Sequence, residues 1–173
     1  MNKDFLEKIY ALKNIHRFNN INRITDESVA EHSFFVAAIV LDLSKDFKFN
    51  VDRAIKLAIV HDYHEIYTGD IVSSAKRLFK DLKETMAKVE IDIAKKYFKD
   101  ESDLLIEISE MKTIESKIVQ LADLYSVLQY TSNELKLGSN PEMKKIFDNT
   151  QEKVNNLIEE IGGSFYKRKW IKK

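Results

Sequence analysis

His61-Asp62-Tyr63-His64-Glu65-Ile66-Tyr67-Thr68-Gly69-Asp70 is a polar stretch that directly follows the apolar run 57–60. Ala54, Leu57 and His61 recur at helical spacing and share one face, with Asp62 about 100° further round the helix. A buried imidazole or carboxylate without a partner is costly, so we expect these groups to be hydrogen-bonded, paired or bound to metal. The stretch therefore predicts a polar site built on helices.

Two more polar residues lie on apolar helical patterns elsewhere in the chain. His32 belongs to a stripe that includes Val29 and Val36, where the alternative is a core histidine bonded to a carbonyl group. Asp123 lies in a segment that is apolar on two sides, where the alternative is a surface ion pair. One metal ion would account for all four candidate ligands, which are His32, His61, Asp62 and Asp123.

The scarcity of helix breakers predicts an all-α fold. The chain has four glycines and one proline in 173 residues. We expect a single domain over residues 1–173. Asp26 is the expected N-cap of the second helix, and either Asn50 or Asp52 that of the third. Gly69 is expected to end the third helix, and Pro141 to lie in the first turn of the last. The expected bundle has about six helices, over 3–16, 26–45, 50–67, 74–98, 111–137 and 141–161.

Composition excludes several classes of protein. The chain has no cysteine, so any metal must have nitrogen and oxygen ligands. The net charge is zero, which gives no electrostatic reason to expect nucleic acid or an anionic membrane as a partner. The start is charged, and the longest apolar run, 34–41, is too short for a membrane span. We therefore expect a cytoplasmic protein.

Two imidazoles and two carboxylates suit one divalent transition metal, either Mn, Co, Ni, Fe or Zn, with positions left open for water and substrate. Such an ion lowers the pKa of water and polarises a phosphoryl oxygen. Glu65 is placed beside this site as a general acid or base, and Asp70, after Gly69, could orient water or a leaving group. His64 is expected at the rim, either exposed or behind the ligands.

In this context the motifs resemble the 5′-deoxynucleotidase branch of the HD-domain metal-dependent phosphohydrolases. The resemblance covers about residues 8–130, and the helix and basic tail over 141–173 add no motif. It implies His32, His61, Asp62 and Asp123 as metal ligands and Glu65 and Asp70 as catalytic residues. It also implies Arg17 as the phosphate-binding residue, with Lys76 as a possible second cation. The segments that carry the resemblance are Leu12 to Phe18, Glu27 to Ser33, His61 to Asp70 and Ala122-Asp123.

Two departures from this branch leave the substrate open. Phe18 stands where the branch often has tryptophan near the sugar, so the choice between deoxyribose and ribose is undecided. The segment 71–74 lacks the prolines that tend to follow Thr-Gly-Asp, so the number of phosphates on the substrate is undecided as well.

The resemblance implies metal-dependent removal of the 5′-phosphate from (deoxy)nucleoside monophosphates. One alternative is release of triphosphate from a dNTP at the same site, and another is a metal- or nucleotide-binding module without turnover. The expected partners are a nucleotide substrate and further copies of the chain, in a dimer or larger assembly. We expect the basic tail, 167–173, to be a solvated end whose removal leaves catalysis intact.

Overall fold

The computed structural model describes residues 3–71, 80–138 and 140–162, and within them regular structure is helical apart from one isolated bridge between His16 and Ser28. The predicted all-α fold is confirmed. The helices are α1 (Lys3–Ala11), the 3-10 helix η1 (Leu12–Asn14), α2 (Val29–Leu43), α3 (Val51–Val60), α4 (Glu65–Thr68), α6 (Lys80–Tyr97), α7 (Ser102–Glu110), α8 (Ile114–Lys136) and α9 (Pro141–Glu160).

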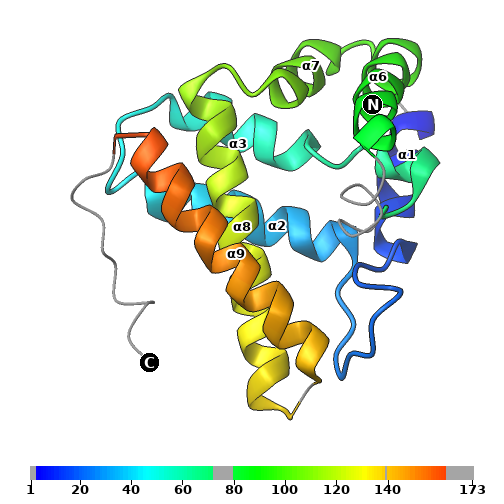
Figure 1. Cartoon of the computed structure of the whole chain (residues 1–173). Coiled ribbons are helices and arrows are strands. Elements are labelled where there is room, and N and C mark those ends of the chain that lie inside the picture. Colours follow the sequence, from blue (N-terminus) through cyan, green and yellow to red (C-terminus); the bar gives the residue numbers. More distant parts are fainter. Residues whose placement is uncertain (1–2, 72–79, 139, 163–173) are drawn as a thin grey trace.

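Helices α2, α3, α8 and α9 form the main core. Figure 1 shows α8 and α9 running side by side along their length, with α2 and α3 beside them. The buried side chains between these helices include Val36, Leu57 and Ile118, all fully enclosed. Because apolar burial is the main stabilising contribution, this core fixes the helices that carry His32 and Asp123 relative to each other.

A second cluster of buried residues holds the other end of the molecule, where α1 and α6 lie (Figure 1). Tyr63 packs there against Phe98, with ring centroids 5.4 Å apart, and against Phe5. Tyr63 is the residue after Asp62, so this packing holds the polar stretch in place from the side away from the main core.

Helix α2 begins two residues later than expected. Ser28 is the N-cap: its hydroxyl accepts from the Glu31 backbone N–H, and the Glu31 carboxylate accepts in return from the Ser28 N–H. Asp26, the expected cap, instead receives a hydrogen bond from Arg23. The reciprocal pair satisfies two helix-end donors, which a lone aspartate does not do.

The expected third helix is broken. Helix α3 is capped by Asn50, one of the two expected caps, but it ends at Val60, and residues 61–64 form a turn before the short α4. Gly69 is the C-cap of α4, as the sequence predicts, and has a positive φ of 66°, which glycine adopts without strain.

Other helix boundaries also differ from expectation. The first helix stops at Ala11, and α7 lies in a segment for which the sequence pattern predicted no helix. A left-handed Met111 separates α7 from α8. Pro141 occupies the first turn of α9, as expected. The start of the expected helix 74–98 lies outside the described residues.

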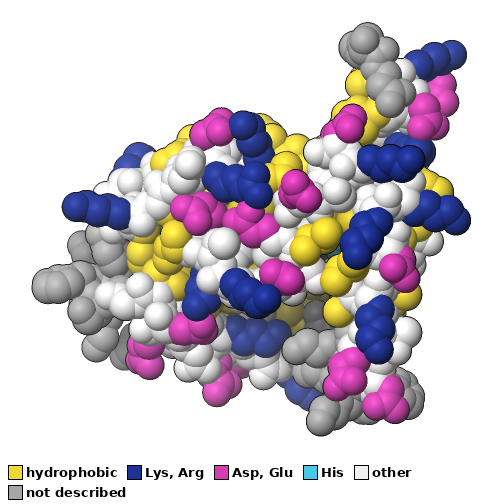
Figure 2. All heavy atoms as spheres, turned by 90° about the horizontal axis from the view of Figure 1, so that it is seen from above, with side chains coloured by type: hydrophobic (Ala, Val, Ile, Leu, Met, Phe, Trp, Pro, Cys, Tyr) yellow, Lys and Arg dark blue, Asp and Glu magenta, His cyan; other side chains and the backbone are white. Residues whose placement is uncertain are grey.

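No helix among the described residues is long and apolar enough to cross a membrane. The face in Figure 2 carries basic and acidic side chains interspersed, with small apolar areas between them. This mixture agrees with the zero net charge and shows no field of one sign on that face.

Candidate active site

The turn after α3 is set by the side chain of His61. Its Nδ1 donates a hydrogen bond of 2.7 Å to the carbonyl oxygen of Ala58. That carbonyl would accept from the N–H of Asp62 if the helix continued, so the side chain competes with the helical hydrogen bond. A proton on Nδ1 also leaves the lone pair on Nε2, the nitrogen that faces the other candidate ligands.

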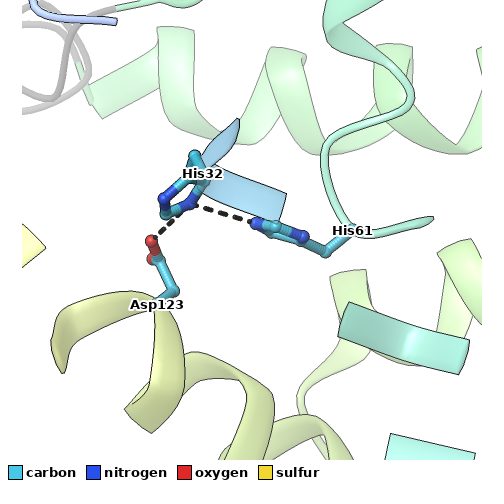
Figure 3. A group of neighbouring side chains, drawn as sticks. All are labelled: His32, His61 and Asp123. Atoms are coloured by element: carbon cyan, nitrogen blue, oxygen red, sulfur yellow. Dashed lines mark hydrogen bonds and ion pairs between the residues drawn. The ribbon is translucent and has the colours of Figure 1, made fainter. Parts of the chain in front are cut away.

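Four donor atoms from three helical regions converge at this turn. The Nε2 atoms of His32 and His61 are 3.3 Å apart, and Oδ1 of Asp123 is 3.0 Å from His32 Nε2 (Figure 3). Oδ2 of Asp62 lies 3.0 Å from His61 Nε2 and 3.7 Å from His32 Nε2. The structure thus brings together all four candidate ligands, although the first and last, His32 and Asp123, are 91 positions apart in sequence.

The spacing of these atoms fits a divalent metal. Nitrogen and oxygen ligands about 2.0–2.2 Å from one ion lie roughly 3 to 3.5 Å apart when they are neighbours in its coordination shell. In addition, Oδ1 of Asp123 is buried and has no hydrogen bond from a donor among the described residues. A buried carboxylate oxygen left in this state is what a metal would satisfy.

The electrostatics of the cluster also suit metal binding. Burial, together with the nearby charge of Arg17, lowers the pKa of His32 from 6.5 to about 4. Burial also opposes ionisation of Asp62 and Asp123, but the adjacent imidazoles outweigh it, so the pKa of each carboxyl group is lower than usual. For His61, the effect of Asp62 and Asp123 exceeds that of burial and raises its pKa above 6.5. Both acids are therefore anionic and His32 is neutral near neutral pH.

Two groups contact the back of the His32 ring. Ser126 Oγ, on α8, is 3.1 Å from Nδ1, and the guanidinium of Arg17 contacts the same nitrogen. A guanidinium only donates, so its bond to Nδ1 and a proton on Nδ1 exclude each other. The Ser126 hydroxyl can accept a hydrogen bond from a protonated Nδ1.

Arg17 is held by acids on several sides. Its Nη1 donates to Glu27 Oε2 at 3.1 Å, and its Nη2 is 3.8 Å from Asp123 Oδ1. Burial opposes the charge, yet Asp123, Asp62 and Glu27 raise the pKa of Arg17 above its ordinary value. Burial raises the pKa of Glu27 despite this pairing. Arg17 is therefore a fixed cation beside the candidate metal ligands.

The structure also places Phe18 and Asp70 together. The backbone N–H of Phe18 donates to Asp70 Oδ2 at 3.2 Å. Phe18 has a φ of 55°, a left-handed conformation that costs a residue with a side chain about 1–2 kcal/mol. Such strain persists where the surroundings enforce it, commonly at functional sites.

Glu65 and His64 lie on the side of the cluster formed by Asp62. Each of these three side chains offers one ligand atom within 4.8 Å of the others. The Glu65 side chain is buried, and that of His64 is 12% exposed, with its Nε2 3.6 Å from Glu90 Oε1. His64 is therefore not an exposed residue. Of the two positions expected for it, the one behind the metal ligands remains. Lys76 lies outside the described residues.

Sequence reasoning missed Glu27 and Ser126, the partners of Arg17 and His32. Only a weak sequence signal pointed to Glu27: it is an acidic residue within the motif segment 27–33, but the motif assigned it no role. Ser126 had none, because a serine on a helix is ordinary. A groove of about 630 Å³ between α2, α8 and α9 is also lined by these two residues, but none of the four candidate ligands lines it. The groove is therefore not the metal site.

Comparison with known proteins agrees with the geometry. The family described as 5′-deoxynucleotidase YfbR-like matches residues 4–169. The 5′-deoxynucleotidase HDDC2 of Xenopus laevis is 30% identical over 145 residues, which are 78% of this chain and 71% of the relative. The human HDDC2 is 28% identical and covers 88% of this chain and 78% of its own.

Solved structures share the fold. The PH0347 protein from Pyrococcus horikoshii OT3 aligns with a TM-score of 0.76 and 26% identity, covering 95% of this chain and 97% of its own. An HD-domain phosphohydrolase from Listeria innocua aligns with a TM-score of 0.75 over 91% of this chain and 81% of its own, at 23% identity. Cyanophage S-2L DatZ, an HD phosphohydrolase solved with dA and one catalytic zinc ion, aligns with a TM-score of 0.68 at 17% identity, over 92% of each chain. With the family match over nearly its whole length, the chain belongs to the YfbR-like 5′-deoxynucleotidase family of HD-domain phosphohydrolases.

Proposed function

We propose that this protein hydrolyses the 5′-phosphate of deoxynucleoside monophosphates to give the nucleoside and phosphate. The observation that carries the proposal is the convergence of four donor atoms from His32, His61, Asp62 and Asp123 beside the fixed cation of Arg17. Nucleotidase relatives and the family match support the same reaction.

His32, His61, Asp62 and Asp123 would hold one divalent transition metal. When bound, the metal activates water and polarises the phosphoryl group. Zinc, the ion in the DatZ structure, is one candidate beside Mn, Co, Ni and Fe. If Nε2 of His32 held the metal, Nδ1 would carry the ring proton and donate a hydrogen bond to the Ser126 hydroxyl. Arg17 would then no longer be bonded to His32.

The remaining residues have separate roles in this proposal. Arg17 binds the phosphate oxygens and stabilises charge as it develops there, for which a planar guanidinium is well suited. Glu65, buried beside Asp62, takes the proton from the attacking water. Asp70 holds Phe18 in place and orients the leaving oxygen, which receives the proton that Glu65 removes from water, while the Phe18 ring contacts the sugar. Lys76 remains a candidate for a second contact with the phosphate.

The test is product analysis with the metal-loaded enzyme. The protein is stripped, reloaded with Mn²⁺, Co²⁺ or Zn²⁺, and incubated with ribo- and deoxynucleoside mono- and triphosphates, and the products are separated by chromatography. We expect single phosphate from deoxynucleoside monophosphates, and the ratio of dNMP to NMP turnover measures sugar selectivity. Intact triphosphate from a dNTP would replace the proposal with triphosphohydrolase activity, and no product with any metal would favour a binding module.

We also propose that the protein is a homo-oligomer. Phe34 and Leu41, on the outer side of α2, are 68% and 52% exposed, and Phe35, which also lines the groove beside α8 and α9, is 49% exposed. Neighbouring exposed apolar side chains of this size commonly mark a contact surface. Cytoplasmic location, and the expected lack of a nucleic-acid or membrane partner, remain predictions; the mixed charges in Figure 2 are in keeping with the latter.

A further inference from the structure

Three side chains form a row that leads away from the candidate metal ligands. The guanidinium carbon of Arg17 is 5.3 Å from the centre of the Phe18 ring. The Phe18 ring in turn stacks on the Tyr130 ring, with centroids 4.7 Å apart and planes within 2° of parallel. Tyr130 is 8% exposed and belongs to α8, the helix that also carries Asp123. The row therefore ties the Arg17–Phe18 segment to a fixed part of the core.

The same helix holds the far end of this loop. The hydroxyl of Tyr130 donates to the carbonyl oxygen of Thr25 at 2.6 Å. One turn further, the fully buried carboxylate of Glu134 accepts from the N–H of Ile24 at 2.7 Å and of Thr25 at 2.8 Å, and from the Thr25 hydroxyl at 2.6 Å. Residues 18 and 24–25 are thus both fastened to α8, and Tyr130 contributes to both attachments.

Phe18 needs such an attachment. Its left-handed backbone, with φ of 55°, is unfavourable for a residue with a side chain and persists only where surrounding contacts enforce it. In this conformation its N–H reaches Asp70, and the neighbouring N–H of Arg17 donates to the Glu27 carbonyl oxygen at 2.9 Å. A loop that relaxed at Phe18 would move Arg17 as well.

We propose that Tyr130 is a positioning residue of the substrate site. Its ring fixes the Phe18 ring and, through Phe18, the guanidinium of Arg17, while its hydroxyl fixes the other end of the same loop. Tyr130 itself touches none of the reacting groups. The consequence for substrate binding rests on the proposed function, in which Arg17 meets the phosphate and Phe18 the sugar.

Hydrogen exchange tests the positioning role without any substrate. Tyr130→Leu should speed exchange of the backbone amides in residues 16–20 by roughly tenfold or more. Tyr130→Phe keeps the stacked ring and loses only the hydroxyl, so residues 16–20 should stay protected while residues 23–27 exchange faster. Tyr125→Leu is the matched control, because this half-buried tyrosine on the same helix packs against the main core. It should leave both segments unchanged.

Unchanged exchange at 16–20 in Tyr130→Leu, with α8 still protected, would overturn the proposal. If Tyr130→Leu does not fold, Tyr130→Phe decides: faster exchange at 23–27 with 16–20 protected supports the role, and no change in either segment contradicts it.

Steady-state kinetics give the second measurement. With a deoxynucleoside monophosphate, Tyr130→Leu should raise KM roughly tenfold with a smaller change in kcat, since the residue positions binding groups. Tyr130→Phe should have a KM close to that of the wild type. The metal content of Tyr130→Leu, Tyr130→Phe and Tyr125→Leu should equal that of the wild type. An equal loss in Tyr125→Leu would contradict the role. If the wild type hydrolyses no nucleotide, the proposed function fails, while the exchange comparison still decides the role of Tyr130.

Discussion

At the scale of single residues, His61 has two effects that arise from one hydrogen bond. Its Nδ1–H occupies the carbonyl of Ala58, which ends α3 and turns Asp62 toward the same point as His61. On a continuous helix these neighbours would diverge by about 100°. Because Nδ1 keeps its proton in this bond, Nε2 is the nitrogen that loses a proton and can bind metal. The adjacent histidine and aspartate can therefore serve one ion because the helix breaks where they occur.

Glu65→Ala should retain metal and lose turnover. The carboxylate lies beside Asp62 but is not needed among the four proposed ligands, so the metal content measured by elemental analysis should match the wild type. Loss of a general base typically costs roughly 10²–10⁴-fold in kcat. Equal activity in this variant would refute the assigned role, and loss of metal would make Glu65 a ligand instead.

Proton release on metal binding should come from His61 alone. At about pH 6 the free His61 is protonated because its pKa is raised above 6.5, whereas His32, with a pKa of about 4, is neutral and both aspartates are anionic. Binding should therefore release about one proton per ion, measured by calorimetry in buffers of different ionisation enthalpy. His61→Asn should abolish the release. Two protons per ion would show that His32 is also charged in the metal-free protein.

The four candidate ligands could be predicted from sequence because each is a costly polar group on an apolar pattern. Ser126 and Glu27 could not, because their contacts with His32 and Arg17 depend on how α8 and the loop before α2 meet. The role proposed for Tyr130 has the same origin, since the stack with Phe18 joins residues 112 positions apart in sequence.

At the scale of elements, the hydrogen-bonded pair of Ser28 and Glu31 sets the start of α2 and so the position of His32 one turn later. Ser28→Ala should lower the free energy of unfolding by about 1 kcal/mol. That change corresponds to a fall in Tm of roughly 2–4 °C for a chain of this size, measured by calorimetry.

Ser44→Ala, at the other end of α2, is the control. Within the described part of the chain, the Ser44 hydroxyl bonds only the Leu41 carbonyl, in an exposed position, so its removal should change stability by less than about 0.5 kcal/mol. Equal losses in the two variants would contradict the assigned cap.

The presence of a helix could be predicted where the periodic apolar pattern was long. The residues at which the helices begin and end could not. Helices α2, α8 and α9 lie within the ranges that their apolar spacing indicates. The end of α3 was missed because the His61 side chain, and not a glycine or proline, breaks the helix. Helix α7 was missed because its nine residues carry no strong cap: Glu101, at the N-cap, makes no side-chain capping bond.

At the scale of the whole molecule, composition predicted an all-α fold. It could not predict that two clusters of buried residues meet at the polar stretch 61–70. His61 follows the last turn of α3 in the main core, while Tyr63, two residues later, is buried in the second cluster. The turn that carries Asp62 is therefore held from both sides. Which clusters meet there depends on how α3 and α6 each pack against α7, and local patterns do not encode it.

The exposed side of α2 yields the last prediction, which concerns assembly. Phe34 and Leu41 are seven residues apart and so lie on the same side of α2, where both are more than half exposed. If this surface joins two copies, sedimentation equilibrium should give a dimer or larger species for the wild type. A lysine placed at the contact would be buried unpaired, which is strongly unfavourable, so Phe34→Lys and Leu41→Lys should shift the protein to monomer.

Leu137→Lys provides the matched control. Leu137 is 57% exposed, close to the exposure of Leu41, but it caps the end of α8 away from this surface. The substitution should therefore leave the assembly intact, because it adds the same charge without placing it at the contact. A wild type that is monomeric at every concentration, or a Leu137→Lys variant that dissociates as readily as Leu41→Lys, would show that α2 is not the contact surface.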